Sequence, residues 1–274
     1  MSLTIRFTAD THVPVEVEGI VPDVVRDMSI DDIRSIQAFH GNEKIKFGDF
    51  FDVDGDPTDG VMDWHGDLKG VHWIGAKMKT GRIHVHGCCG RHLGSEMSGG
   101  EIHVDGDAGD WVGAELHGGL IHVKGNAGHL VGAAYRGSAR GMTSGTILVG
   151  GNVGNELGHT MRRGLIAVAG NAGDLVGFNM LAGTILVFGD SGIRHGAGMR
   201  RGTIGLFGAC DRDPLPSFSP GCDFKPPALN LIFRHLDELG FQTDPVFRSC
   251  SYRIFHGDLI EGGRGEIFIP KIAG

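Results

Sequence analysis

Apolar residues alternate with other residues in short stretches that are bounded by glycine. Six of these stretches read GRIHVHG, GEIHVDG, GLIHVKG, GTILVGG, GLIAVAG and GTILVFG. Each places two aliphatic residues two positions apart, as expected for a β-strand with one buried face. Further apolar positions follow at fixed distances, one occupied by Leu93, Val112 and Val131 and another by Met97, Leu116 and Tyr135. The pattern predicts strands that share one core.

The stretches are copies of a single repeat. Seven copies begin at glycines spaced alike, namely Gly81, Gly100, Gly119, Gly145, Gly164, Gly183 and Gly202. The spacing is 19 residues, except for one of 26 residues that we attribute to an insert at 138–144. Such a unit is too short for a strand and a helix with their own core, but it fits one coil of a β-helix, where like residues stack about 4.8 Å apart. The sequence predicts an all-β fold, a single-stranded right-handed parallel β-helix of about seven coils.

The remaining segments are expected to flank the coils. Residues 44–49 and 60–75 look like degenerate early coils, which places the β-helix domain at 41–208. Residues 1–40 are then an N-terminal cap or arm, and residues 209–274 are a C-terminal arm. Within this arm, ALNLIFRHLDELG follows two prolines and has its apolar residues on one helical stripe. The stripe predicts one α-helix at about 228–239.

The outward face of the predicted strands changes character along the stack. Its central position holds histidine in the first three copies (His84, His103, His122) and apolar residues in the next three (Leu148, Ala167, Leu186). An apolar patch over several strands requires a cover. A helix of about 14 residues is roughly 21 Å long, and four coils span roughly 19 Å. We expect the helix of the arm to cover the patch; a partner subunit is the alternative.

Composition narrows the class of protein. The 48 glycines among 274 residues lack the three-residue period of collagen. A net charge of −8 argues against a nucleic-acid binder, and no apolar run approaches the length of a membrane helix. The N-terminus lacks a secretion signal, and the five cysteines form no disulfide framework. We therefore expect a cytoplasmic protein with reduced thiols.

No motif for catalysis or metal binding is recognised. The chain lacks a nucleophile elbow, a paired-carboxylate constellation and an HExxH motif, so we expect no catalytic residues in it. In the histidine ladder, we expect no acidic or thiolate residue in register to complete a ligand set. We accordingly expect a solvated or interface ladder and no metal site.

Arginines form the candidate binding site. Arg162-Arg163 and Arg200-Arg201 occupy the same places two copies apart, which predicts a separation of about 10 Å along one edge. Arg194 lies nearby in the repeat. Arginine forks bind carboxylates, so we interpret this edge as a site for a polyanionic ligand or an acidic partner. Solvated turn charges are the alternative.

Three runs resemble a known family. The run MRRGLIAVAGNAGDLVGFNMLAGTILVFGDSGIRHGAGMRRGTIGLFG resembles the GXGXG repeat domain in the C subunit of formylmethanofuran dehydrogenase, and CDFKPPALNLIFRHLDELGF and FHGDLIEGGRGEIFIP resemble its tail. The resemblance covers most of residues 40–270. The MRRGT and RHLxELGF elements distinguish the chain from the related C-terminal domain of the glutamate synthase large subunit. A member of the same family occurs as the gamma subunit of the formyltransferase/hydrolase complex of methylotrophic bacteria.

The resemblance implies a non-catalytic subunit of a heteromeric complex in one-carbon metabolism. In the bacterial complex, a formyl group passes between tetrahydromethanopterin and a furan carrier, methanofuran or methylofuran, and leaves as formate. The implied partners are amidohydrolase-like, formyltransferase and dehydrogenase-B-like subunits, which carry the metals, so no cofactor is expected in this chain. The polyglutamate tail of the carrier is the polyanion implied for the arginines. We favour the bacterial complex because the composition lacks the Lys/Glu enrichment of hyperthermophiles. The C subunit of an archaeal-type formylmethanofuran dehydrogenase and a glutamate-synthase-like domain are the alternatives.

Overall fold

The computed structural model describes residues 2–210 and 213–271. Most of its regular structure is β, in a 13-stranded sheet and a 4-stranded sheet. The all-β prediction is confirmed. None of the helices in the two described ranges combines the length and apolar character needed to cross a membrane.

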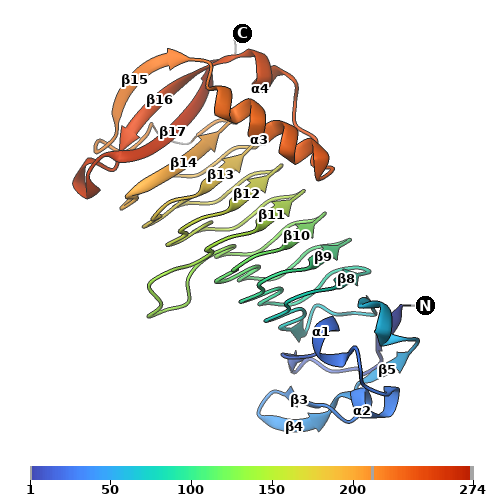
Figure 1. Ribbon diagram of the computed structural model, residues 1–274. Helices are drawn as coiled ribbons and strands as arrows, with labels where there is room; N and C mark the ends of the chain where they lie inside the picture. The colour runs from blue at the N-terminus through green and yellow to red at the C-terminus, as the bar shows by residue number, and fades with distance from the viewer. Residues whose placement is uncertain (1, 211–212, 272–274) are drawn as a thin grey trace.

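The repeats form the middle of the large sheet, where each strand is parallel to the next (Figure 1). The strands, in spatial and chain order, are β6 (Val61–His65), β8 (Arg82–Val85), β9 (Glu101–Val104), β10 (Leu120–Val123), β11 (Thr146–Val149), β12 (Leu165–Val168), β13 (Thr184–Val187) and β14 (Arg201–Leu206). Equivalent residues of successive repeats pair, as Ile102 does with Ile121. A second column of parallel bridges follows the same order, through Leu68, Cys89, Ala108, Ala127, Val153, Ala172, Ser191 and Cys210. Each repeat is therefore one coil of a stack, and we call this region the coil stack.

Aliphatic ladders fill the interior of the coil stack. The isoleucines and valines of the strands from β8 to β13 are fully buried and belong to one continuous core. Close approach between coils explains the glycine at some corners. Gly94 has a φ of +60°, and a Cβ there would lie 2.5 Å from Cδ1 of Ile121. A larger residue would collide with this isoleucine, which belongs to the repeat two copies further along.

The insert begins earlier than the spacing suggested. Met142, not Tyr135, fills the buried methionine position of its coil, and its N–H donates to Gly132 O as that of Met161 donates to Gly158 O. The predicted insert at 138–144 is therefore misplaced by three residues, because the residues added to this coil are 135–141. A gap in glycine spacing fixes the length of an insert but not its start.

The N-terminal end of the coil stack contains the last strands of the large sheet and the separate 4-stranded sheet. β1 (Leu3–Phe7) lies between β6 and β5 (Phe51–Asp54), and β5 ends the large sheet. The 4-stranded sheet comprises β2 (Val15–Glu16), β3 (Gln37–His40), β4 (Glu43–Lys46) and β7 (Val71–His72). Short helices complete this end: α1 (Pro22–Val25), α2 (Ile30–Arg34) and the 3₁₀ turns η1 (Phe47–Asp49) and η2 (Pro57–Asp59).

Of the two early coils predicted, at residues 44–49 and 60–75, only the second is present. Residues 44–49 contain β4, which pairs with β3 in an antiparallel hairpin, and therefore do not form a coil. Residues 60–75 do form one, because β6 pairs in parallel register with β8 and Leu68 starts the second column of bridges. A single short apolar alternation does not distinguish a hairpin strand from a coil strand.

The C-terminal arm covers one face of the coil stack (Figure 1). It contains β15 (Ser219–Phe224), α3 (Pro227–Glu238), α4 (Val246–Ser249), β16 (Ser251–Gly257), η3 (Leu259–Glu261) and β17 (Arg264–Lys271). The helix α3 matches the predicted helix within one residue at each end, whereas α4 is a second helix that was not predicted. Leu148, Ala167 and Leu186 pack with Leu229 and Phe233 of α3 in one buried cluster. The predicted cover is confirmed, and β16 and β17 add Tyr252, Ile254 and Phe268 to it.

Candidate functional site

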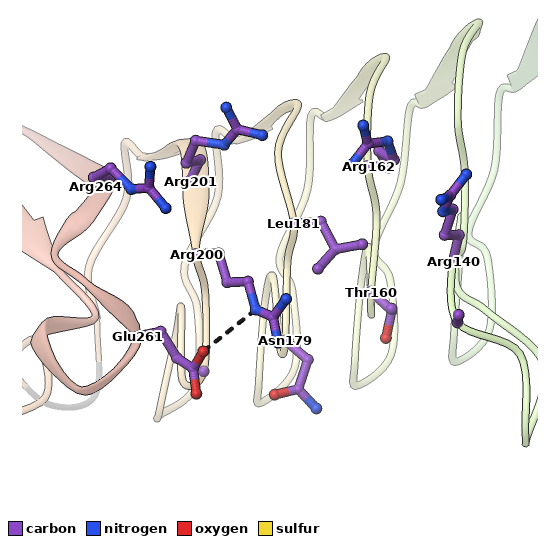
Figure 2. A pocket seen from close by; sticks show the side chains of 11 residues that line it. Arg140, Thr160, Arg162, Asn179, Leu181, Arg200, Arg201, Glu261 and Arg264 are labelled. Carbon is purple, nitrogen blue, oxygen red and sulfur yellow. Dashed lines mark ion pairs between the residues drawn. The ribbon is translucent and has the colours of Figure 1, made fainter.

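A cavity of about 690 Å³ lies on one edge of the coil stack. Figure 2 shows its side chains, which come from the insert, from three coils and from the arm. Five of the lining residues are arginines: Arg140, Arg162, Arg200, Arg201 and Arg264. We call this feature the arginine cavity.

Hydrogen bonds between coils fix the spacing of the arginines. The N–H of Arg162 donates to Met142 O, and the N–H of Arg200 donates to Met180 O, both at 2.8 Å. Leu181 occupies the same place in the intervening coil and donates to Met161 O. In Figure 2 it lies between Arg200 and Arg162. The arginines are therefore two coils apart, as the sequence predicted, with an apolar side chain between them.

The charge of the cavity is strongly positive. Against its five arginines stands one acidic lining residue, Glu261, which gives a formal charge of five minus one, or +4. Glu261 lies 3.3 Å from Nε of Arg200, and the Arg200 side chain is still 62% exposed. Exposed ion pairs of this kind are weak. A carboxylate ligand can therefore replace Glu261 as the partner of Arg200 at little cost.

The predicted site residues are distributed over three places. Arg162, Arg200 and Arg201 share the arginine cavity. Arg163 lines a neighbouring cavity of about 630 Å³, into which Arg140 and Arg162 also extend. Arg194 lines neither of these two cavities.

Sequence reasoning missed Arg264. It lies on β17 directly opposite Arg201 on β14. A signal was present, because RGEI at 264–267 repeats the RGTI of 201–204. The strand was overlooked because Arg264 follows its partner by 63 residues (264 minus 201) and not by the 19 residues of the repeat.

The polar face of the large sheet contains a cluster that the sequence prediction ruled out. Asp63 on β6 pairs in register with His84 on β8. Asp63, His84 and His86 offer ligand atoms that all lie within 4.8 Å of one another. The expectation that no acidic residue completes the ladder in register is wrong, because β6 was not aligned with the repeats.

A third cluster consists of stacked rings on another edge of the first coils. Trp73 stacks on His92 at 4.1 Å between ring centroids, and Trp111 stacks on Tyr135 at 5.0 Å. His92 Nδ1 lies 2.9 Å from the hydroxyl of Tyr135, which donates to Ser95 Oγ. Burial lowers the pKa of His92 to about 4 and raises the pKa of Tyr135 to about 12. Both side chains are therefore neutral near pH 7.

The fold and the site together define a class of protein: a repeat protein with glycines at the corners of its coils and a cationic cavity along one edge of them. The chain belongs to the GXGXG family, whose motif model matches residues 70–213.

Relatives with curated names support the resemblance to the C subunit of formylmethanofuran dehydrogenase. The chain is 46% identical over 80 residues to the C subunit of tungsten-containing formylmethanofuran dehydrogenase 2 of Methanothermobacter thermautotrophicus. It is 41% identical over 86 residues to the C subunit of molybdenum-containing formylmethanofuran dehydrogenase 1 of the same organism. These alignments cover 28% and 31% of this chain, and 30% and 22% of the relatives. Less than a third of either relative is therefore matched.

A solved structure is similar over nearly the whole chain. A chain of the formyltransferase/hydrolase complex FhcABCD from Methylorubrum extorquens, crystallised with methylofuran, superposes with a TM-score of 0.89 and 30% identity. The match covers 98% of this chain and all of the other. The predicted family is thus confirmed.

Proposed function

We propose that this chain is a subunit, without a catalytic centre of its own, of a formyltransferase/hydrolase complex. The complex would pass a formyl group between tetrahydromethanopterin and a furan carrier and release formate. The observation that carries the proposal is the similarity, over 98% of the chain, to a chain of FhcABCD. The metals and the chemistry would belong to amidohydrolase-like, formyltransferase and dehydrogenase-B-like partners.

The arginine cavity would contribute an anion site to the complex. Its formal charge of +4 and its length of two coils suit an extended chain of carboxylates better than a single one. We propose the glutamate-rich tail of the carrier as the ligand, with an acidic surface of a partner subunit as the competing occupant.

We also infer that the coil stack is the right-handed parallel β-helix expected from the sequence. Unbroken parallel register from β6 to β14 and the second column of bridges support this. Crossovers between parallel strands of one sheet are right-handed in about 98% of cases. The domain boundaries at 40/41 and 208/209 remain predictions.

A second candidate function is that of the C subunit in a formylmethanofuran dehydrogenase. The names of the curated relatives favour it, and the chain would then accompany a molybdenum or tungsten enzyme that reduces CO₂. The two candidates differ in the partners that the chain should bring with it.

Co-purification tests the proposal. The full chain, tagged and expressed in the cells that make it, should elute with amidohydrolase-like and formyltransferase subunits, and the assembly should release formate from a formylated carrier. The isolated chain should show no turnover. Elution of the chain alone would contradict the proposal, as would turnover by the isolated chain that a point substitution in it abolishes. Elution with a molybdenum or tungsten subunit would favour the second candidate.

A further inference from the structure

Two histidines and two aspartates meet on the polar face of the large sheet. Asp63 lies on β6, His84 on β8, and His86 and Asp105 directly follow β8 and β9. The three strands are adjacent and in parallel register. The four side chains are between 21% and 34% exposed, so they are held by the sheet and still reached by solvent.

The four side chains form a ring in which imidazoles and carboxylates alternate. His86 Nε2 lies 2.8 Å and His84 Nδ1 lies 3.9 Å from Asp63 Oδ1. On the other side, His84 Nε2 lies 2.9 Å and His86 Nδ1 lies 3.7 Å from Asp105 Oδ2. Each imidazole therefore presents one nitrogen to Asp63 and the other to Asp105.

We propose that Asp63, His84 and His86 bind a divalent transition-metal ion of the Zn²⁺ type. Two imidazole nitrogens and one carboxylate oxygen are a ligand set that such ions favour, and water completes a four-coordinate site. With bonds of about 2.0 Å, tetrahedral geometry places the ligand atoms about 3.3 Å apart. The distances of 2.8 and 3.9 Å from Asp63 fall on either side of that value. All three ligand atoms lie within 4.8 Å of one another, so binding would draw them closer together.

Asp105 supplies the outer support that metal-bound histidines require. A ligating imidazole usually donates its second N–H to a carboxylate, which fixes the tautomer and the ring orientation. Asp105 Oδ2 is in position to accept from His84 Nε2 at 2.9 Å and lies 3.7 Å from His86 Nδ1, and Lys124 Nζ donates to its other oxygen at 2.7 Å.

The neighbouring coils show what the same face looks like without this arrangement. His103 and His122 occupy the equivalent positions on β9 and β10, and their ring centroids lie 6.0 Å apart. Glu101 reaches His103 only at 3.4 Å. His122 is therefore a matched control, a histidine on the same face outside the proposed ligand set.

The experiment is a titration of the full chain, free of any tag, with Zn²⁺ alone and with Co²⁺ alone. We expect about one equivalent of Zn²⁺ to bind, and Co²⁺ to give the visible absorption of a four-coordinate site. Asp63→Asn and His86→Gln should each abolish the Co²⁺ absorption. Asp105→Asn should weaken affinity by about 10- to 100-fold through loss of the outer carboxylate.

His122→Gln should bind as the unmodified chain does, and circular dichroism should show all variants folded. Failure of the folded chain to bind Zn²⁺ would overturn the proposal, as would equal loss of binding in His122→Gln, or binding that survives both ligand substitutions. The inference does not depend on the proposed function, since no partner or carrier enters the titration.

Discussion

At the scale of single residues, the arginine cavity brings together side chains that are more than a hundred positions apart in the chain. Arg140 comes from the insert, Arg162 and Arg200 from coil turns, and Arg264 from the arm. Converging guanidinium groups bind carboxylates bidentately, so the affinity of an acidic ligand should depend on several of them together.

Reversing the charge of Arg200 and Arg201 should weaken the binding of an acidic ligand. We expect the Arg200→Glu/Arg201→Glu variant of the complex to raise the KM for a long-tailed furan carrier by about tenfold. The KM for a furan analogue without the tail should change little. Because the Debye length is about 8 Å at physiological salt, added salt should reduce the difference between variant and unmodified complex. Steady-state kinetics with both carriers measure these effects.

Arg194 provides the matched control for that variant. It is also an exposed arginine of the coil stack, but it lines neither of the two arginine-containing cavities. Arg194→Glu should leave both KM values unchanged. If the Arg200 and Arg201 substitutions instead release the chain from its partners on gel filtration, the cavity binds an acidic surface of a partner. No change in kinetics or in complex mass would mean that these arginines are solvated surface residues.

His92 should make stability depend on pH in a defined window. Burial first, and then His72 and Arg91, lower its pKa to about 4 from an ordinary value of 6.5. Between these values the unfolded chain binds a proton that the folded chain does not, so stability rises with pH. It is fully present above about 6.5 and is lost as the pH falls toward 4.

Replacing His92 with Asn should reduce that dependence. Asn tolerates the left-handed backbone of this position, where φ is +63°. The midpoint of thermal unfolding, measured from about pH 4 to 7, should fall less steeply with decreasing pH in His92→Asn than in the unmodified chain. Parallel curves would show that His92 does not contribute.

At the scale of elements, a ladder of short polar side chains ties each coil to the next. The Oδ1 atom of each accepts a hydrogen bond from a backbone N–H one coil further along, at 2.7 to 2.9 Å; the residues are Asp107, Asn126, Asn152, Asn171 and Asp190. These side chains extend the backbone pairing of the strands around a corner, where glycine provides no side chain.

Removing one rung of the ladder should lower stability modestly. Asn152→Ala deletes the acceptor for the N–H of Asn171, and we expect the free energy of unfolding to fall by about 1 kcal/mol. Asn152→Asp keeps an acceptor at the same place and should stay within about 0.5 kcal/mol of the unmodified chain. Urea denaturation measures both. An equal loss in the two variants would show that the hydrogen bond is not the cause.

At the scale of the whole molecule, the C-terminal arm completes the coil stack. Phe233 of α3 is fully buried and lies 5.9 Å from Phe207 and 6.2 Å from Phe188, measured between ring centroids. The same helix presents Leu231 to solvent, with 59% of it exposed. One helix therefore carries both a residue that docks the arm and a residue that does not.

Truncating the docking residue should loosen the arm. Phe233→Ala should lower the free energy of unfolding by about 3 to 5 kcal/mol, since it leaves a cavity in a buried cluster. It should also increase the binding of a hydrophobic dye to the uncovered patch. Leu231→Ala should change stability by no more than about 0.5 kcal/mol. Chemical denaturation and dye fluorescence test the pair, and similar behaviour of the two variants would contradict the cover.

Prediction from the sequence succeeded where a local pattern is repeated many times. The paired strands and the spacing of Arg162 and Arg200 follow from the repeat, because seven copies exclude a chance match, and α3 follows from the apolar stripe along its 12 residues. Prediction failed at short features that occur once. The strand β4 was mistaken for a coil, and the start of the insert was misplaced, because a single alternation or a single gap fits more than one register.

By itself, the sequence determined the period, the buried and outward positions and the change of the outer face from polar to apolar. These features depend on side chains a fixed number of residues apart, and the sequence gives that spacing directly. Only the tertiary structure decided which distant segments meet. It placed Arg264 opposite Arg201 and Asp63 opposite His84. Both contacts join a repeat strand to one outside the regular spacing, and the physical reason is that hydrogen bonding along a sheet depends on the exposed edge of a strand and not on its distance in sequence.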